Sequence, residues 1–346
     1  MSEHLLDAIL DTGLRAVGVI GMAKNAGKTT ALNHLLAEAS RRNMKIAAAS
    51  IGRDGEEYDS VTLKKKPRVM LPPGSIFVTT DRLARRQVAA GKLDAEVLED
   101  LELNTVIGRV YLFRTAGGGE AELAGLNRIS GMMKIRRRML DESDLFLIDG
   151  ALDRRSSAVP SLTDGIVLST GAVVGRDIES VVRTTQETIT LLTLPEMAPG
   201  PDRETAERAL EGGRSVHLRG GTTAPLSAEE ELLSPAQLKE IGLQEGDLLV
   251  IRGAFTESLA EALIYRRDIP PITLIVKDST RVFVTLRSLR LLESRNIRLL
   301  VMHHLRVAAV TVNPHNPLGA DLDKDELVKA LRKKLAPLPV WDVESY

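Results

Sequence analysis

Short apolar runs alternate with amphipathic stretches along the first half of the chain. The apolar runs are rich in Val, Ile and Leu, which is typical of strands buried on both faces of a sheet. The amphipathic stretches repeat apolar residues three or four positions apart, which predicts helices. The predicted strands are residues 16–20, 44–51, 75–79, 106–113, 144–150 and 165–170, and the predicted helices are residues 3–14, 30–39, 80–90, 93–101, 126–140 and 177–192. This alternation favours an α/β fold with a mostly parallel sheet flanked by helices.

The character of the chain changes at residues 196–225, where Pro, Gly and charged residues gather. Such residues punctuate loops, so we place a linker there, between an N-terminal domain (1–195) and a C-terminal domain (226–346). The C-terminal part again alternates, which predicts a second, smaller α/β domain. Its predicted strands are residues 247–251, 272–277, 297–302 and 308–312, and its predicted helices are residues 256–266, 285–294 and 323–334.

A glycine-rich segment joins the first buried strand to the next helix. Residues 21–30 fit the phosphate-loop pattern G-x-x-x-x-G-K-[ST], with Gly21, Gly27, Lys28 and Thr29 at the fixed positions. Glycines let successive backbone N–H groups curl around an anion, and the helix adds the positive end of its dipole. The sequence therefore predicts a P-loop NTPase-type domain. No N-K-x-D guanine motif is visible, which favours ATP over GTP.

The loop positions have different expected roles. Lys28 is expected to reach the β- and γ-phosphates, and the Thr29 hydroxyl to coordinate Mg²⁺. Lys24 and Asn25 face either the phosphates or a partner. Met22 stands where a deviant form of the loop carries a second lysine, so no lysine is expected to cross a dimer interface. The predicted nucleotide-binding residues are Gly21, Lys24, Asn25, Ala26, Gly27, Lys28, Thr29 and Thr30.

Acidic residues follow two of the predicted strands. Asp149 stands at the end of the apolar run 144–150. Proteins with a phosphate loop usually carry, at the end of such a strand, a carboxylate that holds Mg²⁺. Asp54, with Glu56 as second choice, follows the strand 44–51, although Asp54-Gly55 also suits a solvated turn. We predict Lys28, Asp149 and Asp54 as catalytic residues, and Thr29, Asp149 and Asp54 as metal ligands.

Other loops are expected at the carboxyl edges of the two sheets. Three consecutive glycines in residues 114–120 indicate special backbone angles, close approach of another group, or a tight surface hairpin. The loop 171–175 is a candidate contact for the base or a second ligand. In the C-terminal domain, Arg252-Gly253, Lys277-Asp278-Ser279 and residues 313–317 form a candidate second site without a recognised spacing.

Composition excludes several classes of function. The net charge of −1 and the aromatic content of 3% argue against a nucleic-acid partner, since neither a basic field nor stacking platforms are available. The chain has no cysteine, which excludes disulfides, thiolate metal sites and a cysteine nucleophile. No apolar run approaches the roughly 20 residues of a membrane span, and residues 1–15 lack a signal-peptide core. We expect a soluble, cytoplasmic protein without membrane association.

Several segments together resemble one family. They are GMAKNAGKTT, SIGRDGEEYD, LNTVIGRVYLFRTAGGGEAELAG, LIDGALDRRSSAVPSLTDGIVLSTGA, VTVNPHNPLG and PVWDVES. They are similar to the accessory protein, a reactivase component, that accompanies the cobalamin-dependent lysine 5,6-aminomutase. The resemblance implies a chaperone-like ATPase that acts with a second reactivase subunit and restores an aminomutase whose adenosylcobalamin is damaged. Its expected cofactors are ATP and Mg²⁺.

Two other functions stay open. One is an ATP-dependent small-molecule kinase or ligase that resembles dethiobiotin synthetase in architecture, with its substrate between the nucleotide loop and the 114–120 or 171–175 loops. The other is a nucleotide-binding scaffold without useful turnover. If the chain is a small-molecule enzyme, we expect brisk turnover with one metabolite and no partner. If it is a reactivase, we expect weak activity until its protein client is present.

Overall fold

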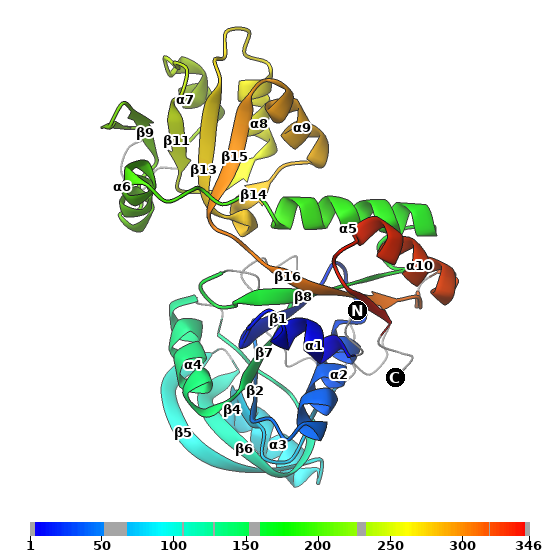
Figure 1. Cartoon of the computed structure of the whole chain (residues 1–346). Coiled ribbons are helices and arrows are strands. Elements are labelled where there is room, and N and C mark those ends of the chain that lie inside the picture. The colour runs from blue at the N-terminus through cyan, green and yellow to red at the C-terminus, as the bar shows by residue number, and fades with distance from the viewer. Residues whose placement is uncertain are drawn as a thin grey trace. The chain divides into compact units, whose positions relative to one another are not determined.

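The computed structural model describes residues 4–51, 68–105, 107–126, 129–151, 160–226, 233–317 and 319–342. The chain divides into two compact units (Figure 1). Unit 1 comprises residues 1–186 and 306–346, and unit 2 comprises residues 187–305. None of the described helices has the length and apolar character that a membrane span requires.

Unit 1 is built on a mixed, mostly parallel sheet of ten described strands. Its strands are β1 (Ala16–Gly21), β2 (Ile46–Ser50), β3 (Val69–Leu71), β4 (Ile76–Thr80), β5 (Leu93–Thr105), β6 (Gly108–Ala121), β7 (Leu145–Ala151), β8 (Gly165–Gly171), β16 (Val307–Asn313) and β17 (Val340–Asp342). Neighbours follow the order β17-β16-β8-β1-β7-β2-β4-β6-β3, and β5 also pairs with β6. The strands from β17 to β4 run parallel, and β3, β5 and β6 pair antiparallel.

Helices cover both faces of this sheet (Figure 1). The helices of unit 1 are α1 (Leu5–Leu10), α2 (Lys28–Arg41), α3 (Asp81–Ala89), α4 (Ile129–Glu142) and α10 (Lys324–Leu335), and α5 (Ile178–Leu192) spans the unit boundary. Val19 of β1 packs in one core cluster with Leu36 of α2. Ile148 of β7 packs in another with Met132 and Met139 of α4. Burial on both faces explains why these central strands are continuously apolar.

Residues 93–105 form strand β5, so the helix predicted for residues 93–101 is wrong. Leu93, Val97 and Leu101 recur every fourth position, as on a helix. β5 instead pairs antiparallel with β6, and its register shifts at three places along the ladder. Each irregularity inserts residues and breaks the two-residue alternation by which a half-buried strand is recognised. Val97 is therefore exposed although its neighbour Leu98 packs against the core.

The domain boundary also differs from the sequence-based division. The segment 196–225 is structured, because it contains α6 (Pro201–Glu211), β9 (Val216–Arg219) and β10 (Thr222–Pro225) of unit 2. Residues 306–346 return to unit 1, where β16 pairs with β8 and β17 pairs with β16. Long-range pairing leaves no local mark on the sequence, and this explains why a contiguous C-terminal domain was expected.

Unit 2 is also α/β, as predicted. Its further elements are α7 (Pro235–Glu240), β11 (Leu248–Ile251), β12 (Phe255–Thr256), α8 (Glu257–Ile264), β13 (Ile272–Asp278), a 3-10 turn (Ser279–Arg281), β14 (Val282–Phe283), α9 (Leu286–Ser294) and β15 (Ile297–His303). The main sheet has the order β10-β9-β11-β13-β15. Strands β11, β13 and β15 are parallel, and β9 is antiparallel to β11 and β10.

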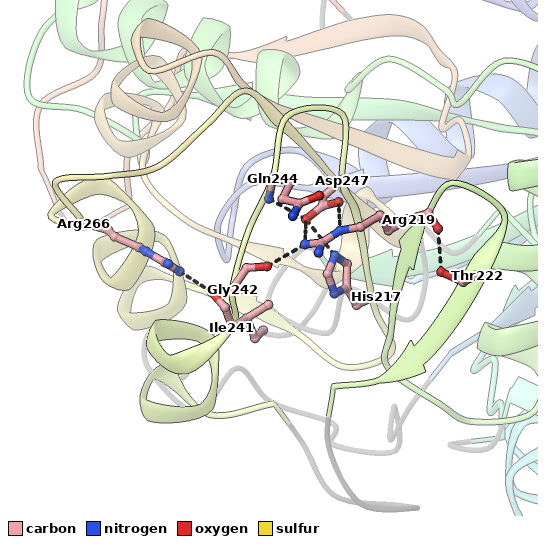
Figure 2. Close-up of polar contacts among 8 residues, drawn as sticks. All are labelled: His217, Arg219, Thr222, Ile241, Gly242, Gln244, Asp247 and Arg266. Atoms are coloured by element: carbon pink, nitrogen blue, oxygen red, sulfur yellow. Dashed lines mark hydrogen bonds and ion pairs between the residues drawn. The ribbon is translucent and has the colours of Figure 1, made fainter.

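A buried carboxylate ties β9 to the start of β11. Asp247 accepts hydrogen bonds from Arg219 Nε at 2.8 Å and Nη2 at 2.6 Å, and from the Gln244 backbone N–H at 2.8 Å (Figure 2). His217 Nε2 lies 2.8 Å from the same carboxylate. The hydrogen bonds from Arg219 are the main reason that the pKa of Asp247 lies well below its usual range, although burial acts in the opposite direction. The cluster therefore stabilises unit 2 through an ionised Asp247.

Asp247→Asn is expected to destabilise unit 2 by about 2 kcal/mol, because the charged hydrogen bonds to Arg219 are lost. A depressed native pKa stabilises the fold fully above the unfolded value of about 3.9, and this contribution disappears as the pH falls further. The variant should therefore lose less stability than the wild type between about pH 5 and pH 2. Hydrogen exchange of the β9 and β11 amides measures both effects. Asp268→Asn is the control, since Asp268 is 80% exposed beside Arg266, and an equal effect of the two variants would contradict the role given to Asp247.

Candidate functional site

The chain leaves the carboxyl end of β1 and turns into α2 through residues 22–27. Asn25 and Gly27 have positive φ angles of 65° and 88°, and Gly27 is the left-handed residue that precedes α2. The Met22 N–H donates to the Ser169 carbonyl of β8 at 2.9 Å, which holds the start of the loop against the neighbouring strand. The backbone N–H groups of the first turn of α2 are thus presented at the carboxyl edge of the sheet.

Lys28 and Asp149 meet at this edge. Strands β1 and β7 are parallel neighbours, with Val19 opposite Asp149, so the end of β7 lies beside the loop that follows β1. Lys28 Nζ is 2.9 Å from Asp149 Oδ1, and the two side chains are 23% and 9% exposed. Two residues more than a hundred positions apart therefore form a shielded ion pair, in which removal of one partner leaves a poorly solvated charge.

The other predicted loop residues differ in how far they are buried. Thr29 and Thr30 lie in the first turn of α2 and are partly buried, as is Asn25. Gly21 and Ala26 are buried, whereas Lys24 is exposed. A Cβ added at Gly21 would lie 3.2 Å from the Ala23 carbonyl oxygen, so the loop folds tightly back on itself there.

Two of the predicted acidic residues, Asp54 and Glu56, lie outside the described residues. Within the described part of the chain, no three His, Asp or Glu side chains gather closely enough to hold a metal by themselves. One carboxylate, that of Asp149, and one hydroxyl, that of Thr29, fit Mg²⁺, which usually keeps several waters and takes one or two protein carboxylates together with substrate phosphates. Asp149 and the Thr29 hydroxyl would be its protein contacts.

Asn313 is a functional candidate that the sequence analysis assigned to the wrong domain. It ends β16 in unit 1, and its Nδ2 donates to the Asn25 carbonyl of the loop at 2.9 Å. A Cβ added at Gly27 would lie 2.9 Å from Asn313 Cβ, which explains a glycine there beyond its positive φ. The pairing of β16 with β8 brings Asn313 to the loop, and no local signal in the sequence indicates that pairing.

The loop after β8 joins this arrangement. The Asn313 carbonyl accepts from the Ala172 N–H at 2.9 Å, and Asn316 Nδ2 donates to the Ala172 carbonyl at 3.4 Å. Residues 171–175 and 313–317 are therefore packed together on the side of the loop 22–27 opposite β7. The expectation that residues 171–175 lie at the carboxyl edge, beside the candidate site, agrees with these contacts.

The glycine segment of residues 114–120 lies outside this arrangement of loops. These residues belong to β6, so the loop and the tight hairpin expected there are both wrong. The other two alternatives agree with the structure. Gly118 and Gly119 have positive φ angles of 80° and 138°. A Cβ at Gly119 would lie 2.2 Å from the Lys92 carbonyl oxygen, and one at Gly118 would lie 2.7 Å from that of Leu71. The glycines thus allow β6 to pass close to these two backbones.

Comparisons with known proteins do not assign this site to a family. No protein-family model matches the chain, and no curated protein is similar to it in sequence. The resemblance to the aminomutase reactivase component therefore stays a prediction that depends on the quoted segments.

Proposed function

We propose that this chain binds Mg-ATP at residues 21–30 and uses its binding or hydrolysis to act on a protein client. The observation that carries the proposal is the ion pair between Lys28 and Asp149. A lysine at the start of a helix after a glycine loop, next to an aspartate at the end of the adjacent parallel strand, suits recognition of a metal-bound phosphate chain. The absence of a visible guanine motif favours ATP.

Each residue has a distinct part in this proposal. Lys28 exchanges its contact with Asp149 for the β- and γ-phosphates, while the N–H groups at the start of α2 donate to phosphate oxygens. Asp149 and Thr29 would hold Mg²⁺, which would supply positive charge against the phosphates. Asp54 is retained as a candidate for the same metal or for the attacking water.

Coupling to a client follows from the contacts around the loop. Asn313 joins the phosphate loop to residues 313–317, and these contact the loop after β8. A change at Asn25 or Gly27 on nucleotide binding is therefore passed to two neighbouring loops. Phosphate contacts order and release loops in nucleotide switches, so the same edge of the sheet suits a surface that a client reads.

The client we propose is a cobalamin-dependent aminomutase, with a second reactivase subunit as partner. This step depends on the family resemblance. The test uses a purified aminomutase inactivated by damage to its adenosylcobalamin, fresh adenosylcobalamin, this chain and the second subunit. Recovery of turnover with Mg-ATP, and not without it or with the Lys28→Ala chain, is the expected result. Failure to recover turnover although Mg-ATP binds would reject the client and favour the small-molecule kinase or ligase.

Asn313→Ala is expected to weaken Mg-ATP binding about tenfold, equivalent to about 1.4 kcal/mol. The hydrogen bond from Asn313 to the Asn25 carbonyl helps to hold the loop in the conformation that presents its N–H groups. Isothermal titration of the full chain measures the affinity, and Asn104→Ala, an exposed position in β5, is the matched control. Equal affinities of Asn313→Ala and the wild type would show that this contact does not shape the loop.

A further inference from the structure

Asn313 is enclosed by two glycines at the edge of the proposed nucleotide site. A Cβ added at Gly27 would lie 2.9 Å from Asn313 Cβ, and one added at Gly171 would lie 1.9 Å from the Asn313 carbonyl oxygen. Both ends of the Asn313 side-chain amide have a partner. Nδ2 donates to the Asn25 carbonyl at 2.9 Å, and Oδ1 accepts from the His315 backbone N–H at 3.0 Å. These two bonds fix the amide with its nitrogen toward the glycine loop.

Asp321 closes the turn that presents the His315 N–H to this amide. Its Oδ1 accepts from the Asn316 backbone N–H at 2.7 Å, and His315 Nδ1 lies 2.9 Å from Oδ1 and 3.1 Å from Oδ2. The Leu322 N–H donates to the Pro314 carbonyl at 3.0 Å, so backbone bonding closes the same turn. One carboxylate thus holds the two residues that follow Pro314, and it fixes the direction of the His315 N–H.

The bonds to Asp321 keep its carboxylate ionised. The hydrogen bond from the Asn316 N–H, followed by that from His315, holds the pKa of Asp321 below its usual value, although desolvation acts in the opposite direction. The side chains of His315 and Asp321 are 54% and 59% exposed, and an exposed ion pair contributes little to stability by itself. The consequence of this contact is therefore the geometry that it imposes on Asn313.

We propose that Asp321 is a positioning residue of the nucleotide site, because it orients the Asn313 amide through His315. The amide in turn holds the Asn25 carbonyl, and with it the conformation in which the glycine loop presents its N–H groups. Asn25 needs this support, since its φ of 65° is uncommon for a residue other than glycine. The effect on affinity rests on the proposed function, because Asp321 can change binding only if residues 21–30 take Mg-ATP.

The first measurement is the exchange of the Asn313 side-chain amide protons with water, followed by magnetisation transfer in ¹⁵N spectra of the full chain without nucleotide. Loss of the signal in Asn313→Ala identifies it. We expect exchange at least about threefold faster in Asp321→Ala and in His315→Ala, because the amide opens more often when its oxygen loses a fixed donor. His315→Asn keeps a side-chain N–H near the position of Nδ1 and should retain the wild-type rate. Asp325→Ala, which removes an exposed carboxylate from the first turn of α10, is the matched control.

Isothermal titration with Mg-ATP then measures the consequence for the site. Asp321→Ala should weaken binding about threefold, as the loss of an exposed charged contact allows. The same substitution should cause no further loss in a chain that already carries Asn313→Ala, because Asp321 acts through Asn313. The midpoint of thermal unfolding should stay that of the wild type in Asp321→Ala, which separates positioning from folding.

Unchanged exchange in both Asp321→Ala and His315→Ala would overturn the proposal, and so would an equal loss of affinity with and without Asn313→Ala. Faster exchange with unchanged affinity would reject Asp321 as a positioning residue and leave the nucleotide site intact. A wild-type chain that does not bind Mg-ATP would instead reject the proposed function, and faster exchange would then assign to Asp321 only the support of the loop.

Discussion

Lys28→Ala is expected to weaken Mg-ATP binding at least about a hundredfold, which corresponds to about 2.7 kcal/mol. The lysine supplies a side-chain cation 2.9 Å from Asp149, beside the glycine loop. Charge-assisted hydrogen bonds to phosphate are about twice as strong as neutral ones, so their loss lowers the affinity for Mg-ATP. Isothermal titration of the full chain measures the effect. Lys45→Ala is the control, because Lys45 is exposed at the opposite edge of the sheet, before β2.

A loss of binding must be separated from a loss of folding. Lys28→Ala removes a charged partner of a carboxylate that is only 9% exposed, so some loss of stability is expected as well. The double variant Lys28→Met, Asp149→Asn removes both charges and should unfold closer to the wild-type temperature than Lys28→Ala does, while it still fails to bind Mg-ATP. Wild-type affinity in either variant would reject the assignment of the nucleotide site.

Gly125→Ala is expected to destabilise unit 1 by about 3 kcal/mol or more, because overpacking against backbone leaves no easy relaxation. An ideal Cβ at Gly125 would lie 1.3 Å from the carbonyl oxygen of Ser50 and 2.3 Å from its carbon. Ser50 ends β2 directly opposite Asp149, and the Ile51 N–H donates to the Asp149 carbonyl at 3.0 Å. The methyl group must therefore displace the backbone that places Asp149.

Urea unfolding followed by circular dichroism measures this destabilisation. Gly242→Ala is the matched control, since a Cβ there meets nothing within 4 Å and the substitution should change stability by less than about 1 kcal/mol. Similar stabilities of the two variants would show that residues 122–126 do not cross the end of β2 as closely as the structure has them.

Local chemistry explains why the strands and helices of unit 1 are largely recognisable from the sequence. The central strands are apolar because both of their faces are covered, and α2 begins where Gly27 adopts a left-handed conformation. The sequence did not predict the short strands β3 and β17, and it predicted a helix where β5 lies. The register shifts of β5 move apolar residues out of a two-residue period, and a helical period arises by chance.

Part of the candidate site is also recognisable from the sequence, and part depends on the pairing of distant strands. Gly21, Gly27, Lys28 and Thr29 are close in sequence, and their spacing alone predicts a loop that presents N–H groups, a lysine and a hydroxyl together. Asp149 was predicted from the end of an apolar run, but only the parallel pairing of β1 and β7 brings it within 2.9 Å of Lys28. Asn313 was not predicted for this site, because the chain passes through the whole of unit 2 before β16 returns beside β8.

The sequence by itself determined the α/β class, the position of the glycine loop and the residue types that a phosphate requires, because backbone conformation and burial act over a few neighbouring residues. The tertiary structure alone decided that residues 306–346 complete the first sheet and that Asn313 contacts the loop. Strand order and register depend on pairing between distant segments, and such pairing is selected by packing of the whole unit.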